Sequence, residues 1–208
     1  MNQNTWSDFN DAEAQQNGFD LIPKGTLVPV RMTIKPGGYD DPAQGWTDGY
    51  ATESFDTGAV YLACEFVVTA GPYAKRKVWS NIGLHSRKGP TWGQMGRSFI
   101  RGALNSAHNV HPQDNTPQAA AARRIQSFAD LDGIEFLARV DIEKDAKGED
   151  RNVVKVAIEP DHKDYAALMR AEPKAAAGGG SSGSPAQAAP ARHMPTRPAV
   201  TGKPAWAQ

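Results

Sequence analysis

The chain has 208 residues, enough for one domain with a sizeable core, and its 23 Lys and Arg balance its 23 Asp and Glu. The single cysteine, Cys64, excludes an internal disulfide and a cysteine-rich zinc site. Residues 1–8 carry no base and no apolar core, and no apolar run reaches bilayer length. We therefore expect a cytoplasmic protein, of a bacterial cell or a phage-infected host, without signal peptide or membrane span.

The predicted elements are mostly strands. Partly alternating, β-rich sequence predicts strands at 25–35, 58–69 and 76–84, and a turn at 71–75 joins the last two. Residues 36–57, punctuated by Pro and Gly, are predicted to form a long loop. A helix is expected at 92–107 with Thr91 as its N-cap. Short helical segments at 119–125 and 127–131, strands at 134–142 and 152–158, and a helix at 161–169 complete the order.

This order, three strands, a helix and two strands, favours a mainly β (α+β) fold. It is the connectivity of the OB-fold, a five-stranded, partly open Greek-key barrel with a helix between strands 3 and 4. Residues 173–208 are rich in Gly, Pro and Ala and cannot bury enough apolar surface to offset their ordering entropy. We therefore predict an N-terminal extension at 1–18, an OB-like domain at 19–172 and a disordered tail at 173–208.

Charge is segregated along the chain. Between Glu65 and Asp114 there is no acid, and Tyr73, Trp79 and Phe99 lie among the bases of that stretch. Its seven bases are Lys75, Arg76, Lys77, Arg87, Lys88, Arg97 and Arg101. Cations track phosphates and rings stack on unpaired bases, so the pattern favours binding to a flexible nucleic-acid strand. The alternative is a solvated strand and helix with core aromatics. The binding hypothesis requires the bases to converge on one groove.

Alternation along the strand at 76–84 places Lys77, Trp79 and Asn81 on one face, where they would offer a cation, a stacking ring and an amide. The alternative is that Trp79 faces the core. Trp46 and Tyr50, on the long loop, are either a second stacking pair or buried under that loop. The candidate nucleic-acid-binding residues are Lys75, Arg76, Lys77, Trp79, Asn81, Arg87, Lys88, Arg97, Arg101, Trp46 and Tyr50.

The segment 66–84 contains an apolar strand, Gly71-Pro72-Tyr73, the basic triplet Lys75–Lys77 and then an aromatic residue and an Asn. It resembles a recurring motif of phage and prophage replication-module proteins, a family long catalogued only as a phage domain of unknown function. Members of this family are taken to be OB-type single-stranded-DNA-binding proteins. The likeness spans roughly residues 19 to 165. It implies binding of single-stranded DNA (ssDNA) in phage replication or recombination.

Two features depart from this resemblance. The residue before the basic pair, usually Gly, is Lys75 here. The tail lacks the acidic tip through which many bacterial ssDNA-binding proteins recruit partners, since residues 173–208 contain no acid. The resemblance therefore gives no support to that route of recruitment.

No catalytic, metal or cofactor site is expected. His108 and His111 have no third ligand placed by the sequence, and the turn near Gly148 lacks the calcium-loop pattern. The expected partner is ssDNA; a second copy and, through the tail near Trp206, a replication or recombination protein are further candidates. The rival functions are a phage structural or protein-interaction domain without nucleic-acid binding, and a nuclease accessory that uses scattered acids with Mg²⁺.

Overall fold

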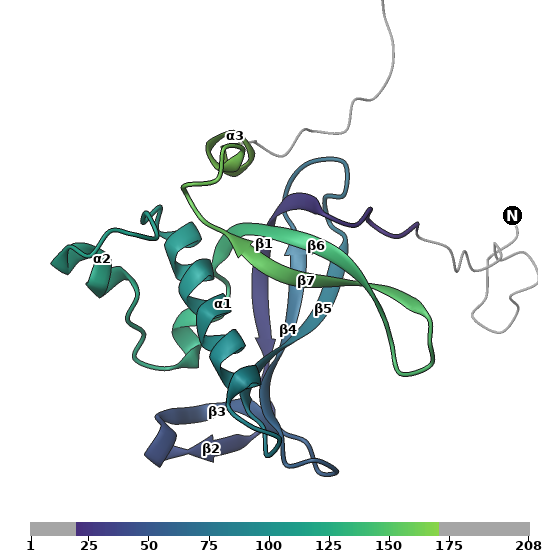
Figure 1. Ribbon diagram of the computed structural model, residues 1–208, viewed down its shortest axis with the longest axis vertical. Helices are drawn as coiled ribbons and strands as arrows, with labels where there is room; N and C mark the ends of the chain where they lie inside the picture. Colours follow the sequence, from purple (N-terminus) through teal and green to yellow (C-terminus); the bar gives the residue numbers. More distant parts are fainter. Residues whose placement is uncertain (1–19, 171–208) are drawn as a thin grey trace, which may run out of the picture. The chain divides into compact units, whose positions relative to one another are not determined.

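The computed structural model describes residues 20–170, which form a mainly β fold with a curled antiparallel sheet and few helices (Figure 1). The strands are β1 (Thr26–Lys35), β2 (Tyr39–Asp41), β3 (Trp46–Glu53), β4 (Val60–Val68), β5 (Lys77–His85), β6 (Glu135–Lys144) and β7 (Asp150–Ile158). The helices are η1 (Pro42–Gln44), α1 (Thr91–Ala107), α2 (Pro117–Ala122), η2 (Phe128–Leu131) and α3 (Tyr165–Met169). The expected extension at 1–18 and the whole tail at 173–208, including Trp206, lie outside the described residues.

The five long strands follow the order β5-β4-β1-β6-β7, and every neighbouring pair is antiparallel. Side chains along β4 alternate between buried and half-buried, so that one face of the sheet closes on a core. There the rings of Phe66, Phe99 and Phe136 meet edge to face, with centroids 5.9–6.2 Å apart. The unpaired edges of β5 and β7 approach each other, and Val154 N donates to Ser80 Oγ at 2.9 Å. The sheet is therefore a half-barrel.

Helix α1 lies across the open side of this sheet, between β5 and β6 in sequence (Figure 1). A Cβ at Gly96 would lie 1.8 Å from the carbonyl oxygen of Gly83, and one at Gly93 would lie 2.4 Å from that of Leu84. The glycines that weaken an isolated helix therefore let the backbone of α1 touch the backbone of β5. The expected N-cap at Thr91 is wrong: the helix starts there, and Pro90 precedes it without a side-chain cap.

The predicted loop at 36–57 is also wrong, because β2 and β3 form a hairpin within it. Gly38 and Gly49 have φ angles of 75° and 67°, and Gly38 N donates to Gly49 O at 2.8 Å. Asp40 Oδ1 accepts a further hydrogen bond from Gly49 N at 2.8 Å. Strand β2 has only three residues, and β3 is interrupted by the left-handed Gly49, so neither shows an apolar alternation and the sequence resembles a loop. With this hairpin the sheet contains seven strands.

The remaining elements lie close to their predicted positions. Helix α2 starts two residues before the expected 119–125 segment and ends at Ala122, while β6 and β7 meet in a longer hairpin than predicted. In residues 20–170 no helix has the length and apolar character needed to cross a bilayer. Tyr165 of α3 donates its hydroxyl to the carbonyl of Ser106, which fixes the end of the described chain against α1.

Candidate nucleic-acid interface

The middle of β5 presents an exposed aromatic ring. Trp79 is 57% exposed, whereas its neighbour Val78 is 2% exposed and belongs to the core. Lys77 and Asn81 are exposed on the same side of the strand as Trp79. The alternative that places Trp79 in the core is therefore wrong, and its ring is accessible to a ligand.

The register extends this surface over two more strands. Glu65 lies directly opposite Trp79, and Thr33 of β1 lies opposite Glu65. Because directly opposed side chains point to the same side of a sheet, the outward residues of β1, β4 and β5 form one surface. We call this surface the sheet face; it comprises Arg31, Thr33, Lys35, Ala63, Glu65, Val67, Lys77, Trp79 and Asn81.

The sheet face also contains an acid that lies at the edge of the acid-free stretch in sequence. Glu65 Oε1 lies 3.0 Å from Lys77 Nζ, and Glu65 Oε2 accepts a hydrogen bond from Trp79 Nε1 at 3.2 Å. Arg31, on the same face, pairs with Glu135 at 2.5 Å. Carboxylates therefore offset part of the positive charge here, and Glu65 holds the indole ring by its N–H group.

Arg31 and Lys35 are cations of this face that the sequence reasoning did not select. Both are exposed on β1, at positions that alternate with the buried Met32 and Ile34. The alternation of apolar and polar residues in segment 25–35 indicates that both side chains point away from the core. Their position beside β4 follows only from the strand pairing, which the sequence does not display.

The turn before β5 carries the other members of the basic triplet. Lys75 is exposed and has a φ angle of 70°, in the left-handed region that favours glycine. Arg76 Nη2 donates to the carbonyl oxygen of Asp20 at 2.8 Å. A pocket of about 470 Å³, which we call the turn pocket, opens beside this turn. Its lining residues are Leu21, Lys75, Arg76, Lys77, Val78, Trp79, Asp150, Arg151 and Asn152.

Arg87 and Lys88 follow the opposite end of β5. The Arg87 guanidinium lies against Gly58, where an added Cβ would come within 2.6 Å of it. Arg87 also lines a pocket of about 200 Å³ whose walls include Trp46 and the acids Asp41 and Glu53. Arg87 therefore shares a pocket with both an aromatic ring and carboxylates. Lys88 lies exposed in the loop before α1.

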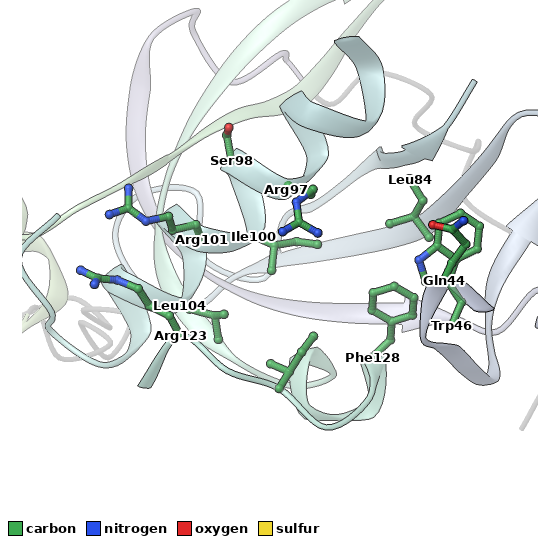
Figure 2. A pocket seen from close by; sticks show the side chains of 11 residues that line it. Gln44, Trp46, Leu84, Arg97, Ser98, Ile100, Arg101, Leu104, Arg123 and Phe128 are labelled. Carbon is green, nitrogen blue, oxygen red and sulfur yellow. The ribbon is translucent and has the colours of Figure 1, made fainter. Parts of the chain in front are cut away.

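Arg97 and Arg101 of α1 meet Trp46 in a separate pocket of about 540 Å³, the arginine groove (Figure 2). Its lining residues are Gln44, Trp46, Leu84, Arg97, Ser98, Ile100, Arg101, Leu104, Arg123, Ile125 and Phe128. Tyr50 is half-buried against the core and is not part of this lining. The ring beside Trp46 is that of Tyr39, with centroids 6.4 Å apart.

Two arginines of this groove are held by backbone carbonyls. Arg101 Nη2 donates to Pro112 O at 2.7 Å. Arg123, which the sequence reasoning missed, donates to Asn105 Oδ1, Asp114 O and His111 O at 2.6, 2.6 and 2.9 Å. These contacts tie the connector between α1 and α2 to the helix, and they give both side chains a structural role.

The seven bases therefore do not converge on one groove. Lys75, Arg76 and Lys77 lie at the start of β5, and the other four follow its end at His85. The eight steps from Lys77 to His85 cover about 26 Å at the usual rise of a strand. The requirement of a single basic groove is not met, and two separate groups of bases take its place.

Cys64 lies in the core and is not placed to act as a nucleophile. Its burial, together with the negative charge of Asp132, raises the pKa of the thiol from 9.0 to about 12. In residues 20–170 no three His, Cys, Asp or Glu side chains come together in a way that would hold a metal ion. A comparison with known protein families and with curated proteins found no match to this chain.

Proposed function

We propose that this protein binds single-stranded DNA without sequence preference, through the sheet face, during phage or prophage replication or recombination. The observation that carries the proposal is the exposed ring of Trp79, set in line with Lys77 and Asn81 on the outer side of the curled sheet. A flat ring accepts any base by stacking, because every base has a π-face.

The strand order supports an OB-fold as part of this proposal. The order β5-β4-β1-β6-β7, with α1 between β5 and β6, is the order expected for a five-stranded OB barrel with its helix after the third strand. In that comparison β4 and β5 are the second and third barrel strands, whose face commonly binds oligonucleotides. The β2–β3 hairpin and the β6–β7 turn then correspond to the two loops that flank such a face.

The role in phage replication or recombination rests on the resemblance of segment 66–84 to phage replication-module proteins. One departure from that family motif lies at a position whose backbone conformation suits glycine. The position where the family usually has Gly is Lys75, and its φ angle of 70° is one that glycine adopts without cost. The backbone at this position is therefore compatible with the family motif, although the residue differs.

The alternative function is a structural or protein-interaction domain of a phage. The observation that favours it is the arginine groove, where Arg101 and Arg123 donate to backbone carbonyls. Cations used in this way stabilise the fold and need no nucleic acid. The sheet face differs, because neither the exposed Trp79 ring nor the exposed Asn81 contributes to the core.

The test is fluorescence anisotropy of labelled oligo-dT with the full chain at about 50 and 200 mM salt, with a duplex of equal length as control. We expect oligo-dT to bind more tightly than the duplex, and the affinity to fall as salt rises, with about 0.7 in the logarithmic slope for each phosphate contact. Added Mg²⁺ should leave the oligonucleotide intact. Absence of oligo-dT binding at the lower salt would favour the structural function, and cleavage would favour the nuclease accessory.

A further inference from the structure

We propose that an acidic and aromatic segment of this same chain, residues 6–13, docks on the turn pocket and the sheet face and competes there with ssDNA. This inference rests on the proposed function, because it assigns a regulator to the same surface. It starts from the composition of the segment that precedes the described residues, and from the point where that segment joins them.

The segment 1–19 contains no Lys and no Arg. Within it, residues 6–13 carry the acids Asp8, Asp11 and Glu13 and the aromatic residues Trp6 and Phe9. Carboxylates and flat rings offer a basic, aromatic surface the same two kinds of contact as the phosphates and bases of ssDNA. The segment is therefore chemically matched to the surface that we assign to the nucleic acid.

The described chain begins at the edge of that surface. Besides the contact of Arg76 with the Asp20 carbonyl, Asn152 Nδ2 donates to Ile22 O and Ile22 N donates to Asn152 Oδ1, both at 2.8 Å. Leu21, between these two anchors, is 38% exposed and lines the turn pocket together with Trp79. Residues 20–22 thus bridge the starts of β5 and β7, and the described chain begins beside the turn pocket.

The charge of the turn pocket is complementary to that of the segment. Four of its lining residues are cations, namely Lys75, Arg76, Lys77 and Arg151, and of these Lys77 is paired with Glu65 at 3.0 Å. Its acid, Asp150, is paired with Lys144 at 2.8 Å. Because the three carboxylates belong to the same chain as these cations, their docking is an intramolecular step, which raises their effective concentration without any new contact.

The segment is long enough to cover the surface. Glu13 lies seven residues before Asp20, and an extended chain of that length reaches up to about 25 Å. The stretch of β5 from Lys77 to Asn81 covers about 13 Å. The carboxylates of the segment can therefore reach the cations of the turn pocket, and the rings of Trp6 and Phe9 can reach the ring of Trp79.

If the segment is docked in part of the molecules, the apparent affinity for ssDNA is the intrinsic affinity multiplied by the fraction of molecules in which the surface is open. The first test neutralises the segment in the full chain with the triple variant Asp8→Asn/Asp11→Asn/Glu13→Gln. A matched control, Asp48→Asn/Asp56→Asn/Asp161→Asn, makes the same change in net charge at exposed acids of the body. We expect the first triple to tighten oligo-dT binding by about fivefold or more, and the control by less than about twofold.

A second variant, Trp6→Ala/Phe9→Ala, keeps every charge of the segment. It should also tighten oligo-dT binding, because the docked segment loses its stacking contacts. If both segment variants bind oligo-dT as the unaltered chain does, the inference is overturned while ssDNA binding stands.

A direct readout needs no DNA. With a benzophenone side chain in place of Phe9, irradiation should cross-link the segment to residues of the turn pocket, and oligo-dT should suppress the product. Cross-links confined to other surfaces overturn the inference, as do cross-links formed mainly between isotopically distinct copies of the chain. If no variant binds oligo-dT, the proposed function fails, and the cross-links alone decide whether the segment docks.

Discussion

The indole N–H of Trp79 donates to the carboxylate of Glu65, the residue directly opposite on β4, at 3.2 Å. The other oxygen of the same carboxylate lies 3.0 Å from Lys77 Nζ. One half-buried acid therefore fixes the orientation of the ring and offsets the charge of the neighbouring cation. The surface gains a rigid aromatic platform and loses part of its attraction for phosphate.

Glu65→Gln should separate these two effects, because the amide oxygen still accepts from Trp79 while the negative charge is lost. We expect tighter oligo-dT binding and a logarithmic salt slope steeper by about 0.7, since Lys77 becomes free to contact a phosphate. The loss of the partly exposed ion pair should cost less than about 1 kcal/mol of unfolding free energy. Glu135→Gln, which releases Arg31 of the same face, should steepen the slope in the same way. If Glu65→Gln leaves the salt slope of oligo-dT binding unchanged, the phosphates do not contact Lys77.

Trp79→Ala should weaken oligo-dT binding by the value of one stacked base, about 1–3 kcal/mol or roughly 5- to 150-fold. Because the ring is 57% exposed, the thermal unfolding midpoint should stay close to that of the unaltered chain. Anisotropy and a thermal melt measure the two quantities. Met95→Ala, which removes a 64% exposed side chain from α1, serves as the control and should leave binding unchanged. Equal losses of oligo-dT affinity in both variants would contradict a stacking role for Trp79.

Lys75→Gly and Lys75→Ala should weaken ssDNA binding alike, because each removes the same cation. Their stabilities should differ, because Lys75 has a φ angle of 70° and glycine relieves the strain of that conformation. We expect the Gly variant to exceed the Ala variant by about 1 kcal/mol in unfolding free energy, measured by denaturant titration. Variants of equal stability would mean that this turn relaxes to another conformation.

Arg123→Met should destabilise the protein by about 2–4 kcal/mol, because Asn105 and two backbone carbonyls lose a charged donor. Arg123→Lys should restore little of this stability. The three donors of an ammonium sit on one nitrogen and cannot reach three acceptors that are spaced to match a planar guanidinium. The exposed neighbour provides a matched control, Arg124→Met, which should leave unfolding unchanged. Below the melting transition, oligo-dT binding through the sheet face should be the same in all three variants.

Cys64 should resist thiol reagents in the folded protein, since burial raises its pKa to about 12. Ellman's reagent at about pH 8 should react slowly in buffer and fast in urea. In the unfolded chain the thiol loses its proton near its ordinary pKa of 9.0, whereas the folded state retains it. The unfolding free energy should therefore fall as the pH rises from about 9 toward 12, and Cys64→Ala should reduce that dependence. Fast modification in buffer would show that β4 opens readily.

Sequence patterns predicted the order of the long strands and of α1, because strand and helix periodicities are local. The same alternation placed Trp79 on one face with Lys77 and Asn81, but it left open whether that face is the surface or the core. The β2–β3 hairpin was not predicted, because β2 has only three residues and the left-handed Gly38 and Gly49 shape the hairpin without leaving an apolar pattern. The position of Glu65 illustrates the larger difficulty. In the sequence it marks the boundary of the acid-free stretch, but strand pairing places it beside Lys77, at the centre of the face.

The role of the arginines was invisible for a related reason. Arg101 and Arg123 donate to backbone carbonyls of Pro112, Asp114 and His111. Every residue carries such an acceptor, so no residue type marks the partner in the sequence. The charges of a chain can be counted from its sequence, but the charges that remain available to a ligand emerge only from the fold.

The hydrogen bond from Val154 to Ser80 joins two strands that share no ladder. The half-barrel thus has a seam closed by side chains, with residues 20–22 fastened across one end of it and α1 packed beside it. Side-chain closures tolerate small changes in spacing that a backbone ladder resists. The edges of β5 and β7 can therefore shift slightly relative to each other without breaking a backbone ladder of the sheet.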